Sequence, residues 1–214
     1  MRLVLFGPPG AGKGTQAQLL HTHFDLAHIS SGDLFRRHLG LGTPLGLRAK
    51  EYMKRGELVP DEVTIDIILD KVMCIPDDEG FILDGFPRNP NQAHELEKKL
   101  TAESRDLDKV VHIDVSEPEL LRRLGGRYTC RACQAPHAIA PGEEASARTC
   151  DKCGGELYQR DDDAPAAVKK RIQVYNDETV PVLRFYRERG VLVEISGENT
   201  IDEVNKQVMA ALDA

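Results

Sequence analysis

The first residues that could do chemistry form a glycine-rich loop with one lysine, "GPPGAGKGT" at positions 7–15. Its spacing is typical of loops whose backbone N–H groups bind nucleotide phosphates at the start of a helix. We expect Lys13 to bridge the β- and γ-phosphates. A plain glycine-rich turn is the alternative, but it does not explain the lysine in register. The expected phosphate contacts are Gly10, Ala11, Gly12, Lys13, Gly14 and Thr15.

One position of this loop departs from the usual pattern. Gly14 stands where a Ser or Thr hydroxyl normally contacts Mg²⁺. Without that hydroxyl, the metal must be held by nucleotide oxygens, waters and a carboxylate from elsewhere. Asp84, which ends the apolar run "FILD", is a candidate to orient a metal-bound water. The alternative is an aspartate that only caps the turn before Gly85.

Four cysteines form a second set with chemical potential. "CRAC" at 130–133 and "CDKC" at 150–153 are sixteen residues apart, which is typical of a zinc ribbon. Four thiolates saturate a tetrahedral ion, so we predict structural Zn²⁺, with iron or cobalt as alternatives. Disulfides are the weaker explanation in a cytoplasmic chain. Cys74 lies outside the set and is expected to be a partly buried apolar residue. The predicted ligands are Cys130, Cys133, Cys150 and Cys153.

Short apolar runs separated by helical stretches must position these groups. The apolar runs lack strict alternation, which favours parallel strands covered on both faces. We therefore predict an α/β fold with a doubly wound sheet and ligands at the carboxyl ends of its strands. The stretch 128–163 breaks this rhythm and is interpreted as an insertion. The expected strands are 3–6, 27–30, 81–84, 110–115 and 191–195.

Composition excludes several classes of protein. The chain has 214 residues, of which 41% are hydrophobic and 29% charged, as in a soluble globular protein. A net charge of −7 argues against general nucleic-acid binding. The first apolar run is too short for a signal peptide, and no later stretch could span a membrane. A cytoplasmic location is expected by default.

Four blocks taken together resemble one family, adenylate kinase: "GPPGAGKGTQ", "SSGDLFR", "DGFPRNPNQ" and "QRDDD". The resemblance covers nearly the whole chain, and the four cysteines indicate the type with a zinc-bearing lid. Glycine after the lysine is usual in that family. The resemblance implies a monomer that reversibly transfers a phosphoryl group from MgATP to AMP, giving two ADP.

The resemblance also implies a domain organisation. The core would have a P-loop NTPase-like fold, with a five-stranded parallel sheet flanked by helices, formed by residues 1–29, 60–125 and 164–214. A helical AMP-binding segment would comprise 30–59. A zinc-ribbon-like lid would comprise 126–163.

Site residues follow from the same resemblance, position by position. Arginine suits phosphate binding because its planar fork donates two hydrogen bonds at once. The implied catalytic residues are Lys13, Asp84, Arg88, Arg127, Arg160 and Arg171. Those implied for AMP are Ser31, Arg36, Glu57, Leu58, Val59, Gly85, Phe86, Pro87, Arg88, Gln92, Arg160 and Arg171. Beyond the phosphate loop, those implied for ATP are Arg123, Arg127, Pro136, His137 and Asn199.

The roles of two residue pairs and three alternative functions stay open. Pro136-His137 stand where the family usually has a threonine-tyrosine pair. Asp162 and Asp163 either gate lid closure through neighbouring arginines or cap the helix at Pro165. The rivals are a UMP/CMP kinase or other nucleoside monophosphate kinase, a zinc-ribbon nucleic-acid-binding module and a motor-type ATPase. Gln92 and the lid favour AMP, and the insertion is not basic as a nucleic-acid module should be.

Overall fold

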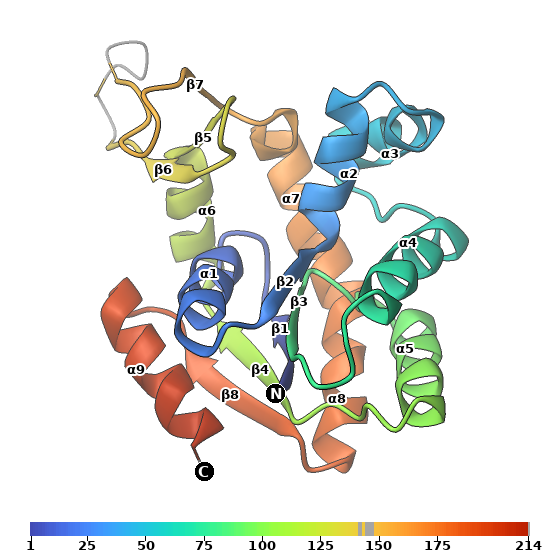
Figure 1. Cartoon of the computed structure of the whole chain (residues 1–214). Coiled ribbons are helices and arrows are strands. Elements are labelled where there is room, and N and C mark those ends of the chain that lie inside the picture. Colours follow the sequence, from blue (N-terminus) through green and yellow to red (C-terminus); the bar gives the residue numbers. More distant parts are fainter. Residues whose placement is uncertain (141–142, 144–147, 214) are drawn as a thin grey trace.

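A computed structural model describes residues 1–140, 143 and 148–213 of the chain. Its central element is a five-stranded parallel sheet with the order β2-β3-β1-β4-β8 (Figure 1). This confirms the predicted fold class, and each strand lies within one residue of its expected start. The strands are β1 (Arg2–Phe6), β2 (Ala27–Ser30), β3 (Phe81–Asp84), β4 (Lys109–Asp114) and β8 (Leu192–Ser196).

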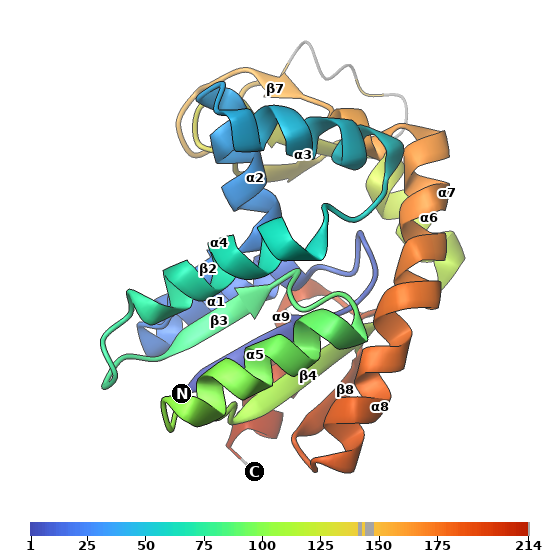
Figure 2. The same cartoon turned by 90° about the vertical axis from the view of Figure 1, so that its right-hand side faces the viewer.

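Helices cover both faces of the sheet, which explains the near-continuous apolar runs. Leu3 and Leu5 belong to one buried cluster, whereas Val4 and Phe6 belong to the other. Successive side chains of β1 therefore enter two separate cores. Helices α1 (Lys13–Phe24) and α9 (Ile201–Leu212) lie on the first face. On the second face lie α4 (Asp61–Met73), α5 (Pro90–Ala102) and α8 (Val180–Glu188) (Figure 2).

Two helices follow β2 and form a small unit of their own. Ser30 caps α2 (Ser31–Gly40), and Thr43 caps α3 (Pro44–Arg55), each by accepting a backbone N–H. The two helices pack closely at Gly46, where an added Cβ atom would lie 2.3 Å from the His38 backbone. A small apolar cluster of Phe35, Ala49 and Val59 holds the unit together.

A second small unit lies above the carboxyl ends of the strands (Figure 1). It is a three-stranded antiparallel sheet with the order β6-β5-β7. The unit follows α6 (Glu117–Gly125) and leads through a short 3₁₀ turn into α7 (Pro165–Val174). A π-helical turn (Tyr175–Thr179) joins α7 to α8. The three strands are β5 (Arg127–Cys130), β6 (Pro136–Ala138) and β7 (Leu157–Tyr158).

Two further observations bear on the sequence predictions. Cys74 is exposed, so the prediction of a partly buried residue is wrong. It is the C-cap of α4 and so lies beyond the last turn of that helix. Within the described residues, no helix is long and apolar enough to cross a membrane.

Candidate active site

The glycine-rich loop joins β1 to α1, as the motif requires. Gly10 and Gly12 have φ values of 89° and 94°, a left-handed conformation that favours glycine. The Nζ atom of Lys13 donates to the backbone oxygens of Gly7 (2.7 Å) and Pro8 (2.9 Å). The N–H of Ala11 donates to Pro8 O at 3.1 Å and so does not face a ligand. The carbonyl groups of the loop thus hold the ammonium group of Lys13 in place.

The charge of Lys13 is sensitive to its surroundings. Burial lowers the pKa of Lys13 to about 8, with Arg88, Arg171 and Arg127 adding to the effect and Asp84 opposing it. A bound polyphosphate would offset the repulsion among these cations.

Asp84 ends β3 beside the loop. Its carboxylate lies 3.7 Å from His28 Nε2 on the neighbouring strand β2. Burial raises the pKa of Asp84, but His28 and Lys13 lower it more, so the carboxylate stays ionised. Asp84 therefore carries a negative charge beside the glycine-rich loop.

One cavity opens between the glycine-rich loop and the α2–α3 unit. Gly56, with a φ of 73°, ends α3 and turns the chain so that positions 57–59 line this cavity. Gln92 projects from the first turn of α5, and Arg88 from the loop before it. Phe86 is absent from the lining because it is 1% exposed in the second core. The predicted residues that line the cavity are Lys13, Ser31, Arg36, Glu57, Leu58, Val59, Gly85, Pro87, Arg88, Gln92 and Arg171.

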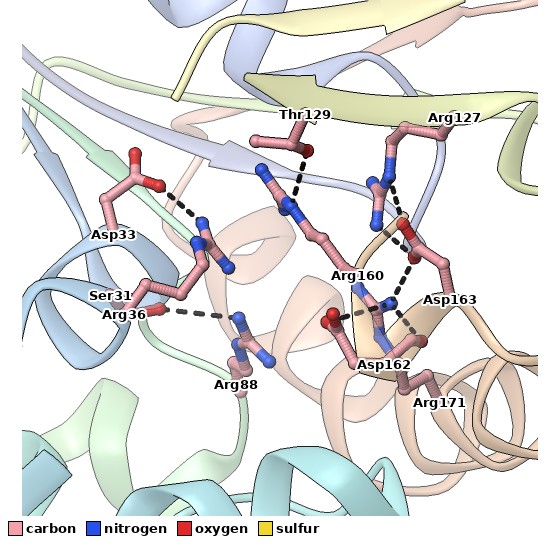
Figure 3. A network of polar contacts seen from close by, with 10 residues as sticks. All are labelled: Ser31, Asp33, Arg36, Arg88, Arg127, Thr129, Arg160, Asp162, Asp163 and Arg171. Atoms are coloured by element: carbon pink, nitrogen blue, oxygen red, sulfur yellow. Dashed lines mark hydrogen bonds and ion pairs between the residues drawn. The ribbon is translucent and has the colours of Figure 1, made fainter. Parts of the chain in front are cut away.

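The arginine side chains are held at defined positions (Figure 3). Arg88 donates through Nε to Gly85 O at 2.7 Å and approaches Ser31 Oγ at 3.4 Å. Arg36 pairs with Asp33, and Arg160 donates through Nε to Thr129 Oγ1 at 2.9 Å. These contacts restrain each of the three side chains.

Two aspartates bind the remaining arginines. Asp163 has a fully buried side chain and pairs with Arg127 and Arg171, the latter at 3.0 Å (Figure 3). Arg171 also approaches Asp162 Oδ2 at 3.1 Å. Neither aspartate caps α7, whose N-cap is Ala164 without a side-chain hydrogen bond. The helix-capping interpretation is therefore wrong.

The arginine pKa values show how crowded with positive charge the site is. Burial, followed by repulsion from Arg171, lowers the pKa of Arg88 to about 10. Burial, followed by repulsion from Arg36, lowers the pKa of Arg160 to about 10. An anion with several oxygens would relieve both repulsions, so the cavity is suited to phosphate groups.

The other predicted ATP contacts lie on α6, in the small sheet and in the loop after β8. Arg123 on α6 donates to Glu119 (2.7 Å) and to the backbone oxygen of Gly197 (2.8 Å). Asn199 follows in the same loop, which the arginine thereby anchors. Pro136 pairs with Thr129 in the small sheet. His137 contacts the Cys150 sulfur at 3.3 Å, beside the cysteine cluster.

The four cysteines come together as their spacing predicted. Their sulfur atoms all lie within 4.8 Å of one another. A tetrahedral Zn²⁺ with bonds of about 2.3 Å needs sulfurs about 3.8 Å apart, so the set fits such an ion. The backbone N–H of Cys133 lowers the pKa of the Cys130 thiol. At Cys153 the backbone N–H of Gly155 lowers the thiol pKa, but the neighbouring sulfurs of Cys130 and Cys133 raise it more. This four-cysteine cluster is consistent with a structural metal.

Sequence reasoning missed several residues that hold the site. Thr129 contacts Arg160, and Thr179 donates to the backbone oxygen of Arg88 at 2.7 Å. Asp61 accepts hydrogen bonds from three side-chain amides next to Arg88. A lone threonine has no signature, and Asp61 after Pro60 indicated only the start of a helix.

Comparison with known proteins bears on the nature of this site. The sequence model of the family described as "Adenylate kinase" matches residues 5–191. An adenylate kinase of Desulfitobacterium hafniense is 49% identical over 213 residues, which cover 100% of this chain and 98% of that protein. One from Methanocella arvoryzae is 49% identical, covering 99% of this chain and 98% of that protein. One from Symbiobacterium thermophilum is 44% identical, covering 100% and 99%.

Proposed function

Since this chain belongs to the adenylate kinase family and has adenylate kinase function, we propose that its cavity binds AMP and its glycine-rich loop binds ATP. The observation that carries the assignment is one cavity lined by Lys13, Arg88, Arg171 and the Gln92 amide. The cations suit phosphate groups, and the Gln92 amide can hydrogen-bond a base. The proposed AMP contacts are the predicted lining residues other than Lys13, together with the backbone at Phe86 and with Arg160.

The transfer itself needs no covalent enzyme intermediate. A phosphate oxygen of AMP attacks the γ-phosphorus of ATP, the bond to the β-phosphate oxygen breaks, and two ADP molecules result. Lys13, Arg88, Arg127, Arg160 and Arg171 hold the reacting oxygens in line and stabilise the charge that spreads over them. Because these cations are already oriented by the protein, little reorganisation is needed during the reaction.

Mg²⁺ bound to ATP would supply further positive charge along the phosphates. The carboxylate of Asp84 fits this role, since it is ionised and lies beside the first turn of α1. It would bind the ion through water, because Gly14 supplies no hydroxyl. Zn²⁺ would be held by Cys130, Cys133, Cys150 and Cys153, and four thiolates leave no position for substrate.

The remaining assignments are part of the same proposal. The core comprises 1–29, 60–125 and 164–214, the AMP-binding segment 30–59 and the lid 126–163; positions 141–142 and 144–147 of the lid lie outside the described residues. ATP would also contact Arg123, Pro136, His137 and Asn199. A monomer suffices, because one chain supplies all these groups. A cytoplasmic location fits both the nucleotide substrates and the reduced thiols.

Removal of Arg88 tests the assignment most directly. Loss of one charge-assisted phosphate clamp costs about 2–4 kcal/mol of transition-state stabilisation. We expect Arg88→Ala to lower AMP-dependent ADP formation by roughly 30–900-fold while the melting temperature changes little. Arg88→Lys should not restore the rate, because lysine lacks the planar fork. Near-normal turnover by Arg88→Ala would contradict the proposed AMP site.

A further inference from the structure

Asp61, the first residue of α4, is the centre of a hydrogen-bond network with the segment after Arg88. Its Oδ1 atom accepts from Asn89 Nδ2 at 2.8 Å and from Gln92 Nε2 at 2.7 Å. Its Oδ2 atom accepts from Asn91 Nδ2 at 2.7 Å. Burial raises the pKa of Asp61, but these three amide donors lower it more. The carboxylate therefore offers only acceptors to its neighbours.

The network fixes which way the Gln92 amide points. Its Oε1 atom accepts from the backbone N–H of Arg88 at 2.8 Å, while its Nε2 atom faces Asp61. Turning the amide over would place Oε1 against a carboxylate and the NH₂ group against an N–H. Both contacts would then be repulsive. Gln92 is 1% exposed, so water cannot offset that loss.

The orientation of the Gln92 amide decides which hydrogen-bond donor and acceptor it presents to a base. A glutamine amide has two N–H donors and two acceptor lone pairs, and one of each is used inside this network. One N–H and one lone pair remain on a side chain that lines the cavity. The Watson–Crick edge of adenine offers an acceptor at N1 and a donor at the 6-amino group. Hypoxanthine and guanine offer the reverse, a donor at N1 and an acceptor at O6.

We propose that Asp61 is a specificity-determining positioning residue that locks the Gln92 amide in the orientation that reads adenine and excludes 6-oxopurines. The inference rests on the proposed placement of the AMP base beside Gln92. Asp61 touches no substrate and acts through Gln92. Without its carboxylate, only the Arg88 N–H still favours this orientation, so the flipped amide, which offers the reversed donor and acceptor pair to a 6-oxopurine, costs less free energy.

Inosine monophosphate is the probe, since its base differs from that of AMP only at the N1–C6 edge. The measurement is kcat/KM for AMP and for inosine monophosphate with saturating MgATP, using Asp61→Ala. We expect the ratio of the two values to fall at least tenfold, mainly through a higher KM for AMP. The kcat for AMP should stay within about threefold, because the arginines remain in place.

Two further variants separate positioning from stability. Glu62→Ala removes the other carboxylate in the first turn of α4, which is exposed. It should leave the ratio unchanged, although it weakens the helix dipole interaction equally. Asp61→Asn keeps one acceptor oxygen for Gln92 and should give a ratio between those of the wild type and Asp61→Ala. If Asp61→Ala does not fold, Asp61→Asn alone must lower the ratio by two- to threefold.

The outcomes distinguish this inference from the proposed function. An unchanged ratio in Asp61→Ala, or an equal change in Glu62→Ala, would overturn the role of Asp61. Gln92→Ala is measured in parallel: if it leaves both the KM for AMP and the ratio unaltered, the proposed AMP site itself fails. If Gln92→Ala lowers the ratio while both Asp61 variants do not, only the inference about Asp61 fails.

Discussion

The Oδ2 atom of Asp84 lies 3.4 Å from the position that a Cβ atom on Gly14 would occupy. The carboxylate at the end of β3 therefore stands beside the turn where other phosphate-binding loops carry a hydroxyl. A serine or threonine at position 14 would bring its hydroxyl into the same space. We propose that this ionised carboxylate orients water on Mg²⁺, since the loop itself supplies no hydroxyl ligand.

Asp84→Asn tests the consequence of this pairing. The amide keeps the shape of the side chain but removes the negative charge that would orient water on Mg²⁺. Changes to such outer ligands typically cost 10–100-fold in metal affinity or activity. We expect turnover to fall by about this factor, with a higher Mg²⁺ concentration needed for half-maximal rate. The KM for AMP should change little. A variant with normal turnover and normal Mg²⁺ dependence would show that Asp84 only ends the strand.

The sequence predicted the strands and the cysteine cluster directly, but it predicted the AMP segment only through the family resemblance. The strands were predictable because both faces of the sheet are covered, which leaves uninterrupted runs such as "LVLF". The cysteine cluster was predictable because ligand spacing is a local property. The AMP segment and the roles of the arginines came only from the family resemblance.

What the sequence could not give are contacts between distant segments. Asp61 meets Gln92 from 31 positions away, and Thr129 meets Arg160 from 31 positions away. No short motif encodes either pair, because each depends on how separate elements pack. Asp162 and Asp163 allowed two readings for the same reason: helix capping is local, whereas their pairing with Arg127 and Arg171 is tertiary.

The affinity for ATP should depend on pH through Lys13. Its pKa is lowered to about 8 in the free protein, and bound phosphates will raise it. The contribution of the ammonium to binding is therefore fully present below pH 8 and is lost as the pH rises above it. For a pKa near 8, we expect ATP affinity to fall about tenfold between pH 7 and pH 9. Calorimetry in buffers of different ionisation enthalpy should show proton uptake on binding near pH 8.5.

Lys13→Met provides the control for this dependence. Its residual ATP affinity should vary little over the same pH range, and proton uptake should disappear. A wild-type affinity that is constant from pH 7 to pH 9 would show that Lys13 stays protonated in the free protein.

Asp163 should stabilise the nucleotide-free protein more than the ligand-bound one. Its buried carboxylate pairs with two arginines, and breaking such a pair typically costs about 3–5 kcal/mol. In a chain of this size each kcal/mol lowers Tm by about 2–4 °C, so Asp163→Ala should lower Tm by roughly 6 °C or more. In the bound state, phosphate oxygens would pair with Arg127 and Arg171 in place of Asp163. A bisubstrate mimic, which consists of two adenosines joined by five phosphates, should therefore restore most of the lost Tm.

Hydrogen exchange on the same variant tests closure of the lid over ATP. Exclusion of water protects ATP from hydrolysis, so kinases need such a closed state. The mimic should slow exchange over β5, β7 and the start of α7 in the wild type, and also in Asp163→Ala. Equal exchange with and without the mimic would contradict closure.

Asp161→Ala is the matched control for the Tm of Asp163→Ala. Asp161 is a neighbouring aspartate that is exposed, so its removal should leave Tm unchanged.

The metal proposed at the four cysteines should hold the lid in shape and take no part in phosphoryl transfer. The four thiolates of Cys130, Cys133, Cys150 and Cys153 would complete the tetrahedral coordination of such an ion and leave no position for water or phosphate. Because these ligands come together only in the folded chain, the free energy of metal binding adds to the stability of the fold. Chelation should therefore lower Tm while turnover well below Tm is largely kept.

Cobalt gives a second readout for this site. Protein loaded with Co²⁺ should show the strong visible absorption of thiolate coordination and remain active. Cys74→Ser removes the cysteine outside the cluster and should leave both the absorption and Tm unaltered. Cys150→Ser removes a buried ligand and should weaken both. If metal-free protein were fully folded at low temperature yet unable to form ADP, the ion would be catalytic. The tetrahedral, closed site assigned to these four thiolates would then be wrong.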